Sequence, residues 1–79
     1  MMNWFDVHFM CDFNWGAKLF RLNLQADDAE QAIRDVAGVV KKIAPGILWR
    51  AKAFPSEEKN EMPGLAGFQA ALRMKVSAR

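Results

Sequence analysis

The chain has 79 residues, of which 52% are hydrophobic and 25% are charged, a composition typical of one globular domain and not of a disordered segment. A domain of this size has little core to spare for a deep pocket, which argues against an enzyme of complex chemistry, and no apolar run reaches the length of a membrane span. The formal net charge of +2 is too small to indicate nucleic-acid binding by itself, so the distribution of the charges has to identify the partner. We expect a single domain over residues 1–79.

Residues 3–13 alternate between two kinds of side chain, which predicts a strand with one buried and one solvated face. The apolar set comprises Phe5, Val7, Phe9, Cys11 and Phe13, and the other set comprises Trp4, Asp6, His8, Met10 and Asp12. Asn14-Trp15-Gly16 follows as a hairpin turn, because Asn and Gly tolerate the positive φ that such turns require. A second strand over residues 17–25 repeats the alternation, with inward Phe20, Leu22 and Leu24 and outward Leu19, Arg21, Asn23 and Gln25.

After the second strand the spacing of the apolar residues changes from two to three or four, which predicts an amphipathic helix. Its apolar positions are Ala29, Ala32, Ile33, Val36, Val39, Val40 and Ile43. Asp27, with Glu30 three residues later, forms a capping box at the start of the helix. Pro45-Gly46 ends the helix.

Two further strands are predicted in the second half of the chain. The third covers about residues 47–54, with Ile47, Trp49, Ala51 and Ala53 on one side and Leu48, Arg50, Lys52 and Phe54 on the other. The fourth covers about residues 68–77, with Phe68, Ala70, Leu72, Met74 and Val76 inward and Gln69, Ala71, Arg73, Lys75 and Ser77 outward. Residues 55–67 between them are rich in proline, glycine and charge, which is typical of a long mobile loop.

These elements predict an α+β fold of the type ββαββ. A right-handed crossover through the helix makes strands two and three parallel, with strand one between them and antiparallel to both. Strand four then pairs with strand three, which gives a four-stranded antiparallel sheet in the order 2-1-3-4 with one helix packed on one face. One helix covers one side only, so the other face of the sheet meets water or a partner.

No group of residues in the sequence has the spacing of a catalytic or metal site. His8 is the single histidine; with Asp6 and Asp12 it gives poor geometry for zinc, and nothing in the spacing brings Ser56 to His8 for a Ser/His/Asp triad. Cys11, the single cysteine, lies on the apolar side of its strand, which favours a buried hydrophobe over a reactive thiol. We therefore expect a protein that is not an enzyme and that holds no metal and no cofactor.

The outward strand positions carry a basic group that we select as the candidate binding surface. Strands three and four contribute Arg50, Lys52, Arg73 and Lys75, and strand two contributes Arg21. Trp4 and Trp15 are candidate anchors, because exposed tryptophans are enriched at interaction hot spots; the alternative for Trp15 is that it folds back over the helix end. Two alternatives remain for the basic group: it keeps the exposed sheet soluble, or it binds nucleic acid directly through phosphate attraction and base stacking.

The segment that joins the hairpin to the helix is Leu24-Gln25-Ala26-Asp27-Asp28-Ala29-Glu30-Gln31-Ala32. With it, the layout of the chain resembles small inhibitor proteins encoded by phages and mobile elements, the anti-CRISPR proteins in particular. The resemblance implies a non-enzymatic inhibitor that docks on a CRISPR effector (Cascade-like) complex and blocks target DNA binding or nuclease recruitment. The partner that it implies is a protein or ribonucleoprotein complex of the host.

The remaining expectations concern location and assembly. The N-terminus has no basic region followed by a continuous apolar stretch, which argues against a secretion signal. We therefore expect the protein in the cytoplasm of the host cell, without membrane contact. We also expect a monomer or a weak homodimer, the latter joined through the edge of strand two or strand four.

Overall fold

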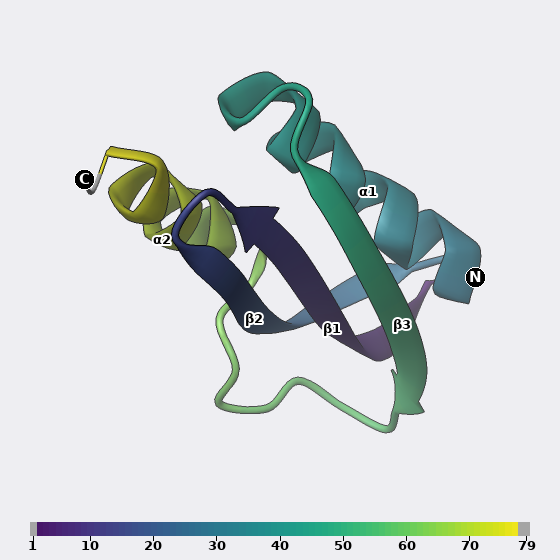
Figure 1. Cartoon of the computed structure of the whole chain (residues 1–79). Coiled ribbons are helices and arrows are strands. Elements are labelled where there is room, and N and C mark those ends of the chain that lie inside the picture. Colours follow the sequence, from purple (N-terminus) through teal and green to yellow (C-terminus); the bar gives the residue numbers. More distant parts are fainter. Residues whose placement is uncertain (1, 78–79) are drawn as a thin grey trace.

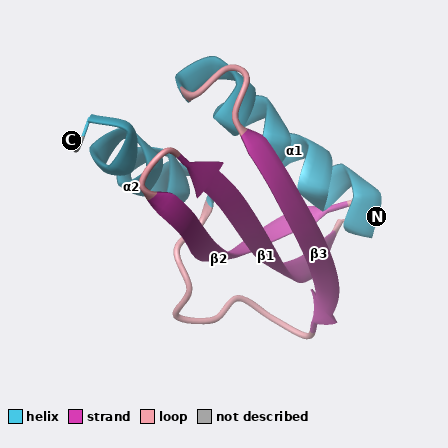
Figure 2. Ribbon diagram, in the orientation of Figure 1, coloured by secondary structure: helices cyan, strands magenta, loops and turns pink. Residues whose placement is uncertain are grey.

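The chain folds into two layers, a three-stranded antiparallel sheet with two helices on one of its faces (Figures 1 and 2). The computed structural model describes residues 2–77. In chain order the elements are β1 (Asn3–Phe13), β2 (Gly16–Ala26), α1 (Ala29–Ile43), β3 (Leu48–Ser56) and α2 (Leu65–Ser77). The predicted ββαββ arrangement, with a four-stranded sheet in the order 2-1-3-4 and one helix, is therefore wrong, although the protein is an α+β fold.

β1 lies in the centre of the sheet and pairs antiparallel with both neighbours, in the order β2-β1-β3. This part of the predicted pairing is confirmed. The apolar face of β1 is also the predicted one, because Phe5, Val7, Phe9 and Cys11 are buried. Gly16, directly after the hairpin turn, has a φ of +139°, a conformation that glycine adopts without the steric cost of a Cβ atom.

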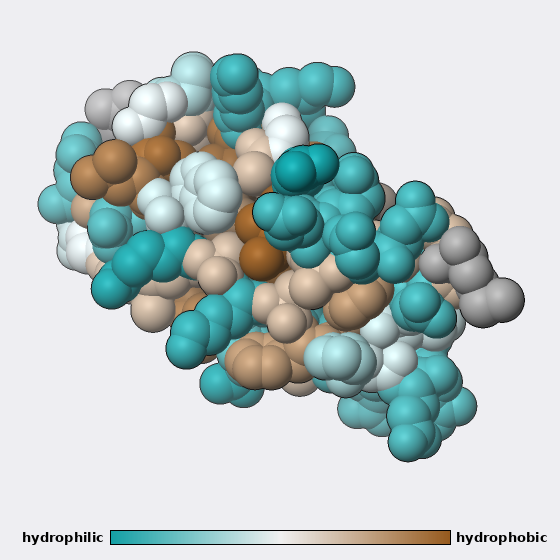
Figure 3. Space-filling view, turned by 90° about the vertical axis from the view of Figure 1, so that its right-hand side faces the viewer, coloured by the Kyte–Doolittle hydropathy of each residue, from teal (hydrophilic) through white to brown (hydrophobic). Residues whose placement is uncertain are grey.

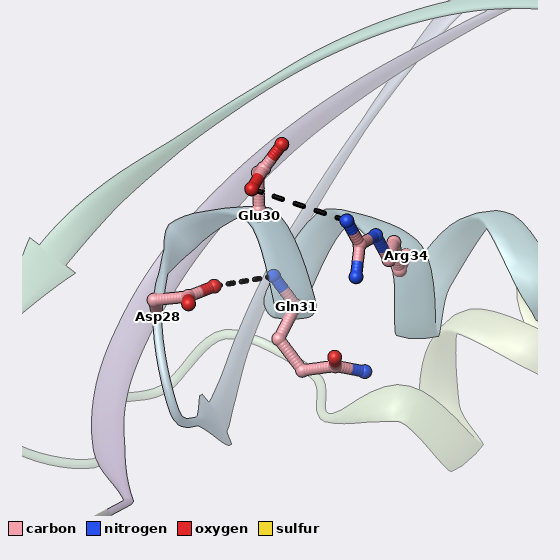
Figure 4. A network of polar contacts seen from close by, with 4 residues as sticks. All are labelled: Asp28, Glu30, Gln31 and Arg34. Carbon is pink, nitrogen blue, oxygen red and sulfur yellow. Dashed lines mark hydrogen bonds and ion pairs between the residues drawn. The ribbon is translucent and has the colours of Figure 1, made fainter.

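α1 begins at an aspartate cap. The capping residue is Asp28, one residue after the predicted Asp27, and its Oδ1 atom accepts a hydrogen bond of 2.8 Å from the backbone N–H of Gln31 (Figure 4). This bond satisfies a helix N–H group that has no partner inside the helix. The helix ends at Ile43, and Gly46 with a φ of +86° turns the chain toward β3.

The C-terminal segment is the helix α2 and not the predicted fourth strand over residues 68–77. Phe68 and Leu72, four residues apart, are both buried, and this spacing fits the turn of a helix as well as the alternation of a strand. Met74 distinguishes the helix from the strand. A strand would turn its side chain inward, whereas the residue is 74% exposed. The segment is rich in leucine, alanine, glutamine, arginine, methionine and lysine, which favour a helix over a strand.

α2 packs beside α1 on the inner face of the sheet and contacts β2 (Figure 2). The Phe68 ring meets Phe20 of β2 edge-on with 5.1 Å between ring centroids, and it lies 6.0 Å from Phe9 of β1. Among the three strands, α1 contacts β3 most extensively. The two helices therefore share the apolar face that the sequence assigned to one helix.

The connection between β3 and α2 is shorter than the predicted loop over residues 55–67. β3 continues through Ser56 and α2 begins at Leu65, so the loop covers residues 57–64. It leads from β3 at one edge of the sheet to α2, which lies beside β2 at the other edge (Figure 1). The loop therefore carries the chain from the β3 edge to the β2 edge, where α2 packs.

Asn23 of β2 holds this loop in place. Its backbone N–H donates to the carbonyl of Pro63 at 2.9 Å, and its side-chain amide donates to Asp6 Oδ1 of β1, also at 2.9 Å. The amide of Asn60 in the loop donates to the same carboxylate oxygen at 2.8 Å. Asn23, predicted to be outward and solvated, is buried, because the loop lies against it. Its polar groups are hydrogen-bonded, as buried amides require.

Truncation of two α2 side chains distinguishes the helix from the strand. Phe68→Ala removes a buried ring, so we expect the free energy of unfolding in urea to fall by about 3–4 kcal/mol. Met74→Ala is the matched control; it removes an exposed side chain and is expected to change the free energy of unfolding by less than about 0.5 kcal/mol. Equal losses from the two substitutions would contradict the helix, because a strand over residues 68–77 buries both side chains.

Candidate functional site

The face of the sheet turned away from both helices carries the candidate site. Phe5, Val7, Phe9 and Cys11 of β1 are buried, so the even-numbered residues of this strand point to the opposite face. The strand register extends this face across β2 and β3. We call this surface the open face, and it consists of Trp4, His8, Met10 and Asp12 from β1, Leu19 and Arg21 from β2, and Leu48, Arg50, Lys52 and Phe54 from β3.

The centre of the open face is positively charged. In the strand register His8 lies directly between Arg21 of β2 and Lys52 of β3. Arg50 lies one residue pair further along the face, opposite Met10. Arg50 and Lys52 lie on β3, and Arg21 lies on the other side of β1, which is two strand spacings or about 10 Å away. The three cations therefore lie around His8 on one face of the sheet.

Carboxylates of the same chain do not neutralise this patch. Asp6 accepts hydrogen bonds from two side-chain amides beside the loop 57–64. Asp12 lies near the other end of β1, paired with Ala17 and Leu48. Within residues 2–77 the cations of the open face form no ion pair. They are therefore available to the carboxylates or phosphates of a partner.

Exposed apolar side chains flank the charged centre. Phe54 is 45% exposed and meets the His8 ring edge-on with 5.2 Å between ring centroids, and Leu48 is 73% exposed. Trp4 and Met10 are partly exposed on the same face. Arginine, methionine and aromatic residues are enriched in protein–protein interfaces relative to the rest of the surface. The open face therefore combines positive charge with the composition of a protein-binding surface.

The structure brings together some of the residues selected from the sequence and separates others. Those on the open face are Arg21, Arg50, Lys52 and Trp4. Arg73 and Lys75 belong to α2 in the helix layer, so the predicted basic half of strands three and four does not form one patch. Phe54 is an exposed aromatic residue of the face that the selection omitted. Its even-numbered position in β3 is the signal that identifies it.

Trp15 and Lys75 line an open cleft of about 560 Å³ that adjoins the open face and shares Asp12 and Leu48 with it. Its walls are the hairpin turn, the segment 44–48 that joins α1 to β3, and the end of α2. The Trp15 ring stacks on Phe13 with 4.9 Å between centroids, yet the residue is 54% exposed. Trp15 is therefore held against the hairpin and accessible at the same time, but it is not part of the open face.

The cysteine does not provide a reactive group. Cys11 is buried, and this burial, with a smaller contribution from the charge of Asp12, raises the pKa of its thiol to about 11. The thiol is therefore protonated at neutral pH and is a poor nucleophile. Within residues 2–77 no group of three or more histidine, cysteine, aspartate and glutamate residues could hold a metal ion.

Comparisons with known proteins provide no related site. The chain matches no protein-family model, no curated protein and no solved structure. Of the helices in the part of the chain that the structure describes, none has the length and apolar character needed to cross a membrane.

Burial of the Cys11 thiol makes stability depend on alkaline pH. The folded-state pKa of about 11 lies above the ordinary value of 9.0, so the unfolded chain loses its proton first. The stabilisation is complete below about pH 9 and is lost as the pH rises toward about 11. From about pH 8 to about pH 10.5, we expect the free energy of unfolding to fall by about 1–2 kcal/mol more for the wild type than for Cys11→Ala.

The substitution Cys11→Ala also lowers stability at every pH because it shortens a buried side chain, so the comparison concerns the two pH slopes. Urea denaturation at each pH measures both. Identical slopes for the two proteins would show that the thiol has the same pKa in the folded and unfolded chains.

Proposed function

We propose that this protein is a non-enzymatic binding protein whose open face docks on an acidic protein surface and inhibits the activity of that partner. The observation that carries the proposal is the row of Arg21, His8 and Lys52 across three strands, bordered by the exposed side chains of Phe54 and Leu48. The cations favour an acidic partner and speed its encounter. The apolar side chains contribute binding energy when the partner removes them from water.

The supporting structure of the face suits this role. Its central strand is held by backbone hydrogen bonds on both sides, and its opposite surface is packed against the helices. The side chains of the face therefore project from a backbone that needs little rearrangement on binding, which lowers the entropic cost of association. A partner of this kind also agrees with the expected location in the cytoplasm of the host cell.

Direct nucleic-acid binding by the same face is the second candidate. The exposed Phe54 ring beside His8 favours it, because unpaired bases stack on such rings. The charge weighs against it. Arg21, Arg50 and Lys52 can neutralise about three phosphates, fewer than the roughly 6–10 contacts that give nucleic-acid binding its strong salt dependence.

Charge reversal on the open face tests the proposed function. The tagged protein captures its partner from host lysate treated with nuclease, and the dissociation constant is then measured with the purified partner. We expect Arg21→Glu with Arg50→Glu to weaken binding at least about 100-fold, because both variant side chains then repel an acidic surface. Circular dichroism verifies that the variant is folded.

Arg73→Glu with Lys75→Glu is the matched control, with the same change of net charge on α2, outside the open face. We expect it to change the dissociation constant by no more than about two-fold, since long-range charge effects are largely screened. Equal weakening by the two double variants would contradict the open face as the binding site. Capture of material that is lost on nuclease digestion would favour the second candidate.

The resemblance to anti-CRISPR proteins gives a narrower prediction for the identity of the partner. We expect the protein, in slight molar excess, to block target DNA binding or nuclease recruitment by a Cascade-like complex in a gel-shift and cleavage assay. The Arg21→Glu with Arg50→Glu variant is expected to leave both steps intact. Undisturbed DNA binding and cleavage across a panel of such complexes would contradict this partner while leaving the open face to be tested with others.

A further inference from the structure

The cleft beside the open face has the volume of a ligand-binding site, about 560 Å³. Three segments that are far apart in the sequence form its walls: the hairpin turn, residues 44–48 and the end of α2. Trp15, Leu48 and Val76 line the cleft, one from each segment, and all three are exposed. Large apolar side chains that are exposed together around a concave surface mark a place where a partner binds.

The aromatic wall of the cleft is held in place before any partner binds. Phe13 and Trp15 both line the cleft, and their rings are nearly parallel, with 6° between the ring planes. Because this stacking already restricts the Trp15 side chain, little conformational entropy is lost when a further ring packs against it. The cleft therefore favours an aromatic side chain as its occupant.

Two charged side chains of the cleft indicate which aromatic side chain fits. Asp12 of β1 and Lys75 of α2 both line the cleft, and within residues 2–77 neither of them forms an ion pair. A carboxylate accepts a hydrogen bond from a phenol O–H group, and an ammonium group is attracted to the face of an aromatic ring. A tyrosine side chain supplies both the ring and the hydroxyl group.

From the cleft the open face continues along β3. Leu48, which also lines the cleft, is followed on this face by Arg50, Lys52 and Phe54. Figure 3 views the molecule from the side of β3 and α1 and shows apolar surface between the hydrophilic groups. Residues two apart in a strand are separated by about 7 Å, so Arg50 lies about 7 Å and Lys52 about 13 Å from Leu48.

We propose that the cleft and the cations of β3 together bind one extended segment of the acidic partner, with a tyrosine in the cleft and carboxylates on the second and fourth residues from it. An extended chain also advances about 7 Å every two residues, so its carboxylates reach Arg50 and Lys52 in turn. This inference rests on the proposed function, because it specifies what the acidic surface of the partner presents. It adds that a short linear segment is sufficient for recognition.

Fluorescence polarisation with a short dye-labelled peptide tests this inference without the partner. The probe is Tyr-Ser-Glu-Ser-Glu with both ends blocked, made in this order and in the reverse order, because the cleft does not fix the direction of the bound chain. We expect one of the two orders to bind with a dissociation constant of about 10–100 µM. The matched control has the same residues with both glutamates directly beside the tyrosine. We expect it to bind at least about five-fold more weakly, because its carboxylates do not match the spacing of the cations.

Variants of the protein assign the two parts of the site. Trp15→Ala removes the aromatic wall and Arg50→Glu reverses one cation, and we expect each to weaken binding of the probe at least about 10-fold. Trp15→Phe keeps an aromatic ring and is expected to stay within about three-fold of the wild type. Arg34→Glu is the matched charge reversal on α1, away from the site, and is expected to change the dissociation constant by no more than about two-fold. Circular dichroism verifies that each variant is folded.

The contact of the tyrosine hydroxyl with Asp12 has its own test. Replacement of the tyrosine of the probe by phenylalanine is expected to weaken binding to the wild type about three-fold. The same replacement is expected to have no effect on binding to Asp12→Ala, because the acceptor is then absent. Equal effects on the two proteins would contradict the assignment of the tyrosine to the cleft.

Three results would overturn the inference: no binding of either order of the probe at about 1 mM, equal binding of the matched control peptide, or unchanged affinity of Trp15→Ala. Failure of the proposed function is distinguishable from these results, because charge reversal at Arg21 and Arg50 tests it with the whole partner. A partner that depends on Arg21 and Arg50 but not on Trp15 would support the open face and exclude the linear segment.

Discussion

The hydrogen bonds of one asparagine hold the loop that leads to α2 against the sheet. Asn23 binds the loop 57–64 through its backbone N–H and the Asp6 carboxylate through its side chain. These bonds lead the chain from the β3 edge to the β2 edge and so place α2 over β2. α1 packs mainly against β3, and Phe68 and Leu72 of α2 are the side chains that complete the core beside β2. A buried polar group on one face of the sheet thus holds the loop that leads to the helix covering the other face.

The parts of the fold that long repeating patterns specify could be predicted from the sequence. The residue types alternate along β1 and, over a shorter run from Phe20 to Gln25, along β2, and a shift of one residue would exchange their two faces, so the hairpin and its buried side follow from local pattern. α2 could not be assigned in this way, because the buried positions Phe68 and Leu72 fit both periods. The burial of Asn23 could not be predicted either, since it depends on a loop whose Asn60 is 37 residues further along the chain.

The candidate site also contains residues that the local pattern places correctly and residues that it does not. The orientation of Arg21, Arg50 and Lys52 follows from their position relative to the apolar residues of their own strands, which is a local property. Arg73 and Lys75 were assigned to the surface as outward positions of a fourth strand. This segment is the helix α2, so the two residues are not part of the open face. The accessibility of the open face is a tertiary property, because it depends on both helices packing on the same side of the sheet.

The hydrogen bond between Asn23 and Pro63 also occupies part of one edge of the sheet. A sheet with two free edges has a valency of two, and such units add end to end into ribbons like those of cross-β fibres. Here the loop 57–64 occupies part of the β2 edge. The loop that leads to the second helix therefore also reduces the number of β2 backbone groups that are open to pairing with a further strand.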